Sequence, residues 1–249
     1  MTHVSRALPA SRPADPAAAA AAAAEPAAGR WAVAWLPAPG TALARSGLTW
    51  LQGCKQGSKG FLAAISWQRE FHAVLKDSLR LRAPQQEEDF VAAARRLAAS
   101  TQPFMLPPLQ ADLWRDRLVL CPERPVEAGH PLRALADRCV RELDTFRAPL
   151  SLMERAKRLT PSHRRSLDQE QHLLDERWGS GEVFHRWRFH LRLGEGLPQK
   201  LRPAALKLAL QHFGSQPLRD LHAQGMAVLR QGGPFKPWAV VAHLPFGPR

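Results

Sequence analysis

The sequence predicts an α/β (α+β) fold that consists of two related lobes, and three observations lead to this prediction. A nine-residue pattern occurs twice, starting at Phe71 and at Phe189, with Phe, His, Leu and Leu at the same four offsets. In each copy apolar and polar residues alternate with a period of two, which is typical of a half-buried strand. In both halves a helix and two further strands are expected after this pattern. The repeated order indicates a duplicated domain.

The composition favours an anionic partner. The 249 residues can bury a sizeable core, and 35 Lys and Arg against 22 Asp and Glu give a formal net charge of +13. Such a basic protein attracts polyanions or phosphorylated substrates. Cys54, Cys121 and Cys139 have no C-x-x-C spacing, so we expect reduced thiols in a cytoplasmic protein, without a zinc site or disulfide framework. No apolar run approaches the length of a membrane span, so no membrane partner is expected.

The composition also changes along the chain. Residues 1–29 are rich in Ala and Pro and are expected to be a disordered tail. A wrongly assigned start codon or an organelle presequence is an alternative for this segment. Residues 30–249 are expected to form a single bilobal domain. Its parts are lobe one, about 30–125, a helical connection, about 130–178, and lobe two, about 180–249.

Local patterns define the elements of lobe one. A short apolar run from Trp31 to Leu36, stopped by Pro37, predicts a central strand. Thr41 is a suitable cap for the helix that follows. Acidic residues at the start and arginines near the end favour a helix that opens at Glu87. The expected order is a strand over 31–36, a helix over 41–51, a loop over 52–60, the first histidine strand, a helix over 87–99, and strands over 104–109 and 117–121.

Local patterns also define the elements of the helical connection and of lobe two. Pro131 suits the first turn of a helix, and apolar residues recur on one helical face as far as Leu143. The next block is helical and very basic, and a solvated helical face accounts for most of its charges. The expected elements are helices over 131–143, 151–159 and 161–177, the second histidine strand, a helix over 203–213, and strands over 218–229 and 235–244.

His72 and His190 are the candidate catalytic residues. The alternation predicts that His72 shares a strand face with Lys76, and that His190 lies between Arg188 and Arg192. Guanidinium groups match phosphate oxygens, and imidazole exchanges a proton near neutral pH. A histidine on a strand face is often ordinary surface chemistry, but its repetition at the same parity favours a functional role.

Two imidazoles that face each other across a cleft can cleave a cyclic phosphodiester. One activates the water and the other protonates the leaving oxygen, while cationic donors stabilise the phosphoryl oxygens. Lys76, Arg192 and Arg188 are the predicted phosphate-binding donors. This chemistry requires no metal and no cofactor, and neither is expected.

The chain resembles the two-histidine (2H) phosphoesterase superfamily, whose members carry an H-x-[ST] motif in each lobe of a duplicated fold. It is most similar to a bacterial branch labelled phosphonate metabolism proteins. The resemblance implies antiparallel sheets that line a central cleft, with helices outside, and hydrolysis of a small cyclic phosphate or an RNA-terminal cyclic phosphate. The segments that carry it are 31–40, 71–76, 144–150, 177–179 and 188–193.

The motifs depart from the superfamily at the hydroxyl positions. Val74 and Arg192 stand where the resemblance implies Ser or Thr that donates a hydrogen bond to phosphate, and the chain has no tyrosine. Val74 is a phosphate-binding position that has lost its hydroxyl. Three functions therefore stay open: a cyclic phosphodiesterase, an inactive relative that binds a phosphorylated metabolite or nucleic acid, and a protein whose histidines are idle. A small phosphorylated molecule or an RNA end is the expected partner of a monomeric protein.

Overall fold

The computed structural model describes residues 29–55, 71–83, 86–161, 167–214, 218–233 and 236–248. The expected tail therefore lies outside the described residues except for Gly29. Within these ranges, no helix is both long and apolar enough to cross a membrane. The elements are β1 (Arg30–Trp35), α2 (Ala42–Lys55), β2 (Ala73–Leu79), α3 (Glu87–Ala99), β3 (Phe104–Met105), β4 (Leu109–Trp114), β5 (Arg117–Pro122), α4 (Pro131–Leu143), η3 (Asp144–Phe146), α5 (Leu152–Leu159), α7 (Gln169–Trp178), η4 (Phe184–Arg186), β6 (Leu191–Gly194), η5 (Gln199–Leu201), α8 (Arg202–Phe213), β7 (His222–Ala223), β8 (Gly225–Gln231) and β9 (Trp238–Pro245).

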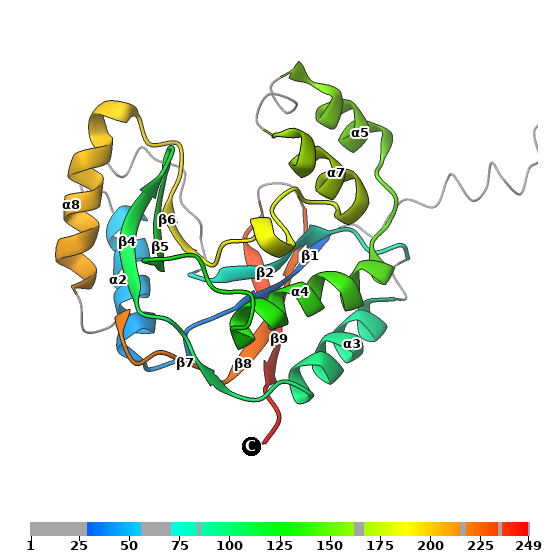
Figure 1. The fold of residues 1–249 in the computed structure, drawn as a ribbon, viewed down its shortest axis with the longest axis horizontal. Helices are drawn as coiled ribbons and strands as arrows, with labels where there is room; N and C mark the ends of the chain where they lie inside the picture. Colours follow the sequence, from blue (N-terminus) through cyan, green and yellow to red (C-terminus); the bar gives the residue numbers. More distant parts are fainter. Residues whose placement is uncertain are drawn as a thin grey trace, which may run out of the picture.

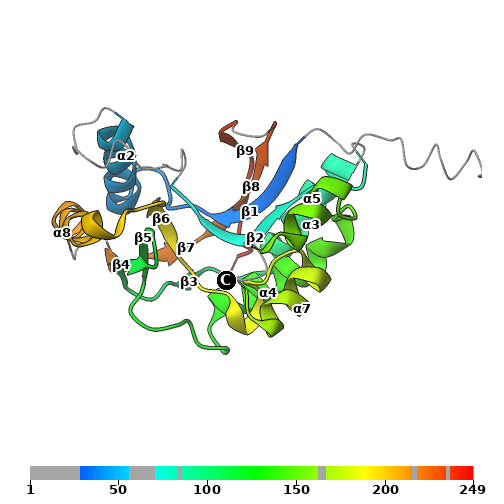
Figure 2. The same cartoon turned by 90° about the horizontal axis from the view of Figure 1, so that it is seen from above.

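Antiparallel sheets form the frame of the molecule. A four-stranded sheet has the order β2-β1-β8-β9, a three-stranded sheet has the order β4-β5-β6, and β3 pairs with β7. Helices α3 and α4 pack against the larger sheet, whereas α8 packs against the smaller sheet and contacts α2. Figures 1 and 2 show these two groups of helices on opposite sides of the molecule. The predicted mixed fold with antiparallel sheets is confirmed.

Each of the two larger sheets combines strands from both halves of the chain. β1 and β2 pair in one sheet with β8 and β9, and β6 joins β4 and β5 in the other. The lobes were expected to cover residues 30–125 and 180–249, but each of these sheets contains strands from both ranges. The assignment of residues 30–249 to one bilobal domain stays a prediction.

The predicted central strand is confirmed by β1, which is buried on both faces. Trp31 and Trp35 point into the main core, where Trp31 meets Phe90 of α3 in an edge-to-face contact at 5.8 Å. Ala32 and Ala34 lie on the opposite face. Burial on both faces explains the continuous apolar run that predicts this strand.

Caps, prolines and charged first turns in the sequence account for where α2, α3 and α4 begin. The Thr41 hydroxyl accepts a hydrogen bond from the backbone of Ala44 at 3.2 Å, although α2 continues through part of the predicted loop to Lys55. α4 starts at Pro131 and buries the predicted apolar face. α3 has the predicted bounds and carries its acidic first turn. Capping and amphipathic spacing therefore account for these helices.

Prolines account for one of the differences between the expected and the observed elements. The expected strand over 104–109 is split into β3 and β4 because Pro107 and Pro108 have no N–H to donate to a ladder. In lobe two the strand expected over 218–229 is split into β7 and β8. The helix expected over 161–177 is observed from Gln169, and residues 162–166 lie outside the described ranges.

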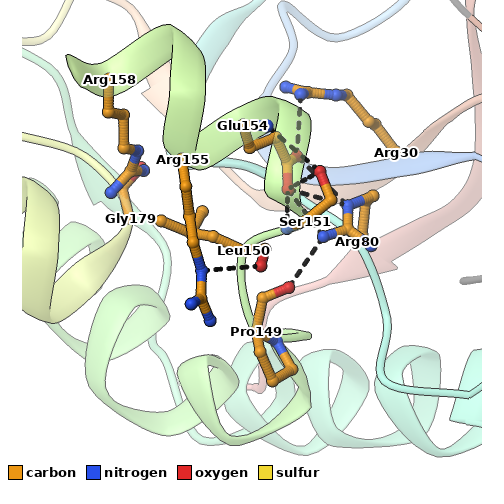
Figure 3. Close-up of polar contacts among 9 residues, drawn as sticks. All are labelled: Arg30, Arg80, Pro149, Leu150, Ser151, Glu154, Arg155, Arg158 and Gly179. Carbon is orange, nitrogen blue, oxygen red and sulfur yellow. Dashed lines mark hydrogen bonds and ion pairs between the residues drawn. The ribbon is translucent and has the colours of Figure 1, made fainter. Parts of the chain in front are cut away.

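Helix α5 is attached to the larger sheet through arginine–carboxylate pairs (Figure 3), and α7 is attached to α5 in the same way. Glu154 of α5 accepts hydrogen bonds from Arg80 at 2.6 Å, from Arg30 at 3.2 Å and from the Ser151 backbone at 2.9 Å. Arg158 of α5 pairs with Asp175 of α7 at 3.0 Å. These contacts fix both helices beside the sheet, and they show that Arg158 is not simply a solvated charge.

Candidate functional site

The structure brings His72 and His190 together. Each histidine directly precedes a strand, His72 before β2 and His190 before β6, and these two strands are in contact. The Trp187 indole N–H donates to the Val74 carbonyl at 3.1 Å and so joins the two segments. The histidines are close enough that a positive charge on His190 lowers the pKa of His72.

His72 is almost completely buried, with 3% of its surface exposed. Burial lowers its pKa to about 4, and the positive charges of Arg192 and His190 act in the same direction. Its Nδ1 atom has no hydrogen-bond partner among the described residues. The imidazole is therefore neutral at pH 7 and able to accept a proton.

His190 is held in one orientation and one tautomer. Its Nδ1 lies 3.0 Å from the Arg188 carbonyl oxygen, which can only accept a hydrogen bond, so Nδ1 carries the proton and Nε2 is left to react. Burial lowers the pKa of His190, the Arg188 carbonyl raises it, and Arg192 lowers it. The carbonyl is the contact that favours a protonated ring at this position.

Trp114 forms one wall beside His190, and its role is not visible in the sequence pattern. Its ring is stacked obliquely on the imidazole, with 4.9 Å between centroids, and the Arg188 guanidinium lies 5.9 Å from the indole centroid. The indole N–H donates to an Asp112 carboxylate oxygen at 3.1 Å. Asp112 and Trp114 are two positions apart on β4, so strand alternation would have placed them on one face.

Arg192 occupies the second of the two lost hydroxyl positions and lies near both histidines. Its charge lowers the pKa of His72 and of His190. One terminal nitrogen donates to Glu195 at 2.9 Å, while Nε is buried without a hydrogen-bond partner among the described residues. A guanidinium with an unused donor in this position can hold a phosphoryl oxygen.

Lys76 does not share the face of His72. Val33 is opposite Lys76 and Ala34 is opposite Val74, so β2 contains an extra residue, Leu75, between the two pairs. Such a bulge reverses the alternation. The Lys76 side chain is therefore buried on the other side of the strand, 3% exposed, with its ammonium nitrogen 2.8 Å from Asp144 Oδ1.

The Lys76 pair is part of a small structural network. Arg147 donates to both carboxylate oxygens of Asp144, at 2.8 and 2.9 Å. Burial alone would raise the pKa of Asp144, but the hydrogen bonds from Arg147 and Lys76 lower it below its usual range. Lys76 thus has an ionised partner on the other side of β2 from His72, so its ammonium group does not face the histidine as predicted. Arg188 and Arg192, by contrast, lie beside His190.

The described residues offer neither a metal site nor a reactive thiol. Among the described residues, no group of three or more His, Cys, Asp or Glu side chains could hold a metal ion. Cys54, Cys121 and Cys139 are buried, and burial raises the pKa of the free thiols of Cys121 and Cys139 to about 12. These thiols are therefore uncharged at neutral pH and unsuited to nucleophilic attack.

Matches to known proteins show which family the chain belongs to. Residues 74–238 match the family described as "Protein of unknown function (DUF1045)". Ribose 1,5-bisphosphate phosphokinase PhnN of Janthinobacterium sp. (strain Marseille) is 30% identical over 189 residues, which are 74% of this chain. The chain spans only 40% of that relative.

Solved structures show the fold. A crystal structure of a phosphoesterase has a TM-score of 0.50 at 11% identity, covering 90% of this chain and 100% of that one. E. coli LigT complexed with 3'-AMP has a TM-score of 0.49 at 12% identity, covering 89% and 99%. The chain belongs to the DUF1045 family and has the fold of the matched phosphoesterase structure.

Proposed function

We propose that this protein is a phosphoesterase that hydrolyses a cyclic phosphodiester with His72 and His190 as acid–base pair. The observation that carries the proposal is the meeting of the buried His72 imidazole and the half-buried His190 imidazole, from distant parts of the chain, beside Arg192. A neutral pair next to a cation suits an anionic substrate, whose own charge raises both histidine pKa values on binding. The cytoplasmic location and the monomeric state of the protein stay predictions.

The different surroundings of the histidines support different roles in this proposal. His72 has a pKa of about 4 and accepts the proton of the attacking water as the new P–O bond forms. His190 is protonated on both ring nitrogens once the anionic substrate has raised its pKa; it keeps the Nδ1–H on the Arg188 carbonyl and donates the Nε2 proton to the leaving oxygen as the old P–O bond breaks. Arg192 stabilises the phosphoryl oxygens. The product is a phosphate monoester, and general acid–base catalysis of this kind contributes about 100-fold or more.

Hydrolysis assays with a panel of cyclic phosphates test the proposal. The panel contains nucleoside 2',3'-cyclic phosphates, ribose cyclic phosphates and an RNA with a terminal 2',3'-cyclic phosphate. The sugar phosphates are included because the matched relative is named for a ribose bisphosphate. Turnover should fall about 100-fold or more in His72→Ala and His190→Ala. His222→Ala is the matched control, because His222 is exposed on β7 and does not line the site of the two histidines. Equal turnover in all variants would reject the acid–base pair.

A weakened enzyme that mainly binds its ligand is the second candidate, because Val74 cannot donate a hydrogen bond. Restoring the hydroxyl in Val74→Thr should raise turnover if the site is a weakened enzyme. If Val74→Thr has no effect while a phosphorylated ligand binds to a protein without turnover, the binding function is favoured. Arg192→Thr should lower turnover, since Arg192 is the cation near both histidines.

A further inference from the structure

A cavity of about 470 Å³ lies directly beside His190. Trp114 and Arg188, which both contact the histidine, also line this cavity. The remaining walls come from the turn between β4 and β5 and from α7 and η4. Its volume is within the range of small-molecule sites. The lining residues are Trp114, Arg115, Asp116, Arg117, Leu167, Gln171, Glu182, His185, Arg186 and Arg188.

Three arginines in this cavity have no carboxylate partner among the residues that the structure describes. Arg115, Arg117 and Arg188 make no ion pair in the part of the chain that the structure describes, and we call them the unpaired arginine cluster. Arg186, on the opposite wall, is neutralised by Asp168 at 2.9 Å and by Glu170 at 2.6 Å.

The cavity keeps an excess of positive charge next to the reacting groups. Asp116 and Glu182 also line it, but they are fewer than the arginines and form no ion pair with them among the described residues. The charge of Arg117 lowers the pKa of His190 and that of Glu182 raises it, so both side chains lie near the histidine. An anion in this cavity would be adjacent to the proposed reaction.

The backbone of the turn is strained at one arginine of the unpaired arginine cluster. Arg115 has φ 58°, in the left-handed region that an unstrained turn would usually fill with glycine. The turn residues Arg115 and Asp116 connect the paired ends Trp114 and Arg117. Strain of this kind often accompanies ligand sites, where the side chain matters more than the local backbone energy.

We propose that this cavity binds a second phosphate group of the substrate, which is then a cyclic phosphodiester that also carries a phosphate monoester. The inference rests on the proposed function and names its substrate class. Three guanidinium groups supply planar pairs of donors that fit the oxygens of a phosphate dianion. The reacting phosphodiester lies at His72, His190 and Arg192, and the second phosphate lies at Arg115, Arg117 and Arg188.

Calorimetric titration with two matched probes tests the inference. Adenosine 3',5'-bisphosphate should bind about 10-fold or more tightly than 3'-AMP, because only the former can occupy both anion positions. In Arg115→Ala and Arg117→Ala this ratio of affinities should fall toward one. Arg95→Ala, which removes an exposed arginine on α3, is the control and should keep the ratio.

The outcomes separate this inference from the proposed function. A ratio near one in the wild type, or an equal loss of the ratio in Arg95→Ala, would overturn the second-phosphate site even if cyclic phosphates are hydrolysed. A high ratio that depends on Arg117 would support the site even in a protein without turnover, since the titration measures binding alone.

Discussion

Two arginine-rich regions of the molecule differ in how their charges are compensated. In the first, Arg30, Arg80, Arg147 and Arg158 line a cavity beside the larger sheet, and each has a carboxylate partner. We call this set the paired arginine cluster. The unpaired arginine cluster next to His190 has no such partners among the described residues. Arginine content alone therefore does not identify a binding site, because a carboxylate partner takes up donors of the guanidinium that a ligand would otherwise use.

Asp144→Asn should have the largest effect on stability. The substitution leaves the buried Lys76 and the half-buried Arg147 without their carboxylate. Loss of one partner of a buried ion pair typically costs about 3–5 kcal/mol. Urea denaturation of Asp144→Asn should therefore show a loss of about 3 kcal/mol in the free energy of unfolding. Asp137→Asn, at a more exposed helical pair, is the control. A loss no larger than that of the control would mean that the Lys76 pair is not structurally important.

Acid should destabilise the region of the histidines first. His72 has a pKa of about 4 in the folded protein, below the ordinary value of 6.5, so the unfolded chain takes up its proton earlier. The titration of His72 does not reduce the free energy of unfolding above pH 6.5. As the pH falls from 6.5 to 4, this titration lowers the free energy of unfolding by about 3 kcal/mol. Unfolding measured across this range should become less pH-dependent in His72→Asn. An unchanged pH dependence would show that His72 is not buried as described.

Glu154→Gln should test the centre of the paired arginine cluster. Burial alone would raise the pKa of Glu154, but hydrogen bonds from Arg80 and Ser151 lower it from 4.5 to about 2. Its contribution to stability is therefore present above pH 4.5 and is lost as the pH falls toward 2. Because Glu154 is 23% exposed, we expect a loss of about 2 kcal/mol at pH 7, less than the pKa shift alone implies. Glu142→Gln, which breaks an exposed pair with Arg138, should cost less than about 0.5 kcal/mol.

The smallest effect on stability is expected in the unpaired arginine cluster. Arg115→Ala and Arg117→Ala remove no ion pair among the described residues, so the free energy of unfolding should change by less than about 0.5 kcal/mol. The same denaturation experiment measures it. A loss of about 2 kcal/mol would contradict the distinction between the two clusters, because it would assign these arginines a structural role.

Local patterns in the sequence predict the elements better than their relations. The apolar run of β1, the acidic start of α3 and the periodic face of α4 are each contained in a short segment, and the structure confirms them. The predicted histidines also lie close together. These features depend on near neighbours in the chain or on a repeat that is visible in the sequence.

The remaining features depend on contacts between distant residues. The bulge at Leu75 breaks the alternation that placed Lys76 beside His72, and nothing in the apolar pattern marks the extra residue. The stacking of Trp114 on His190 requires β5 to lie between β4 and β6. The partners of Arg158 and Arg80 are likewise known only once α5 and α7 are placed beside the sheet.

The pairing of β1 with β8 has a consequence for how the chain folds. Ala34 lies opposite Ala227, so the larger sheet requires an early and a late segment of the chain to meet. Contacts between such distant residues slow folding, because a long loop must close before the pairing can stabilise it. During synthesis, the edge of β1 that pairs with β8 stays unpaired until the late strands leave the ribosome. We therefore expect nascent or truncated chains without β8 and β9 to aggregate and to depend on chaperones.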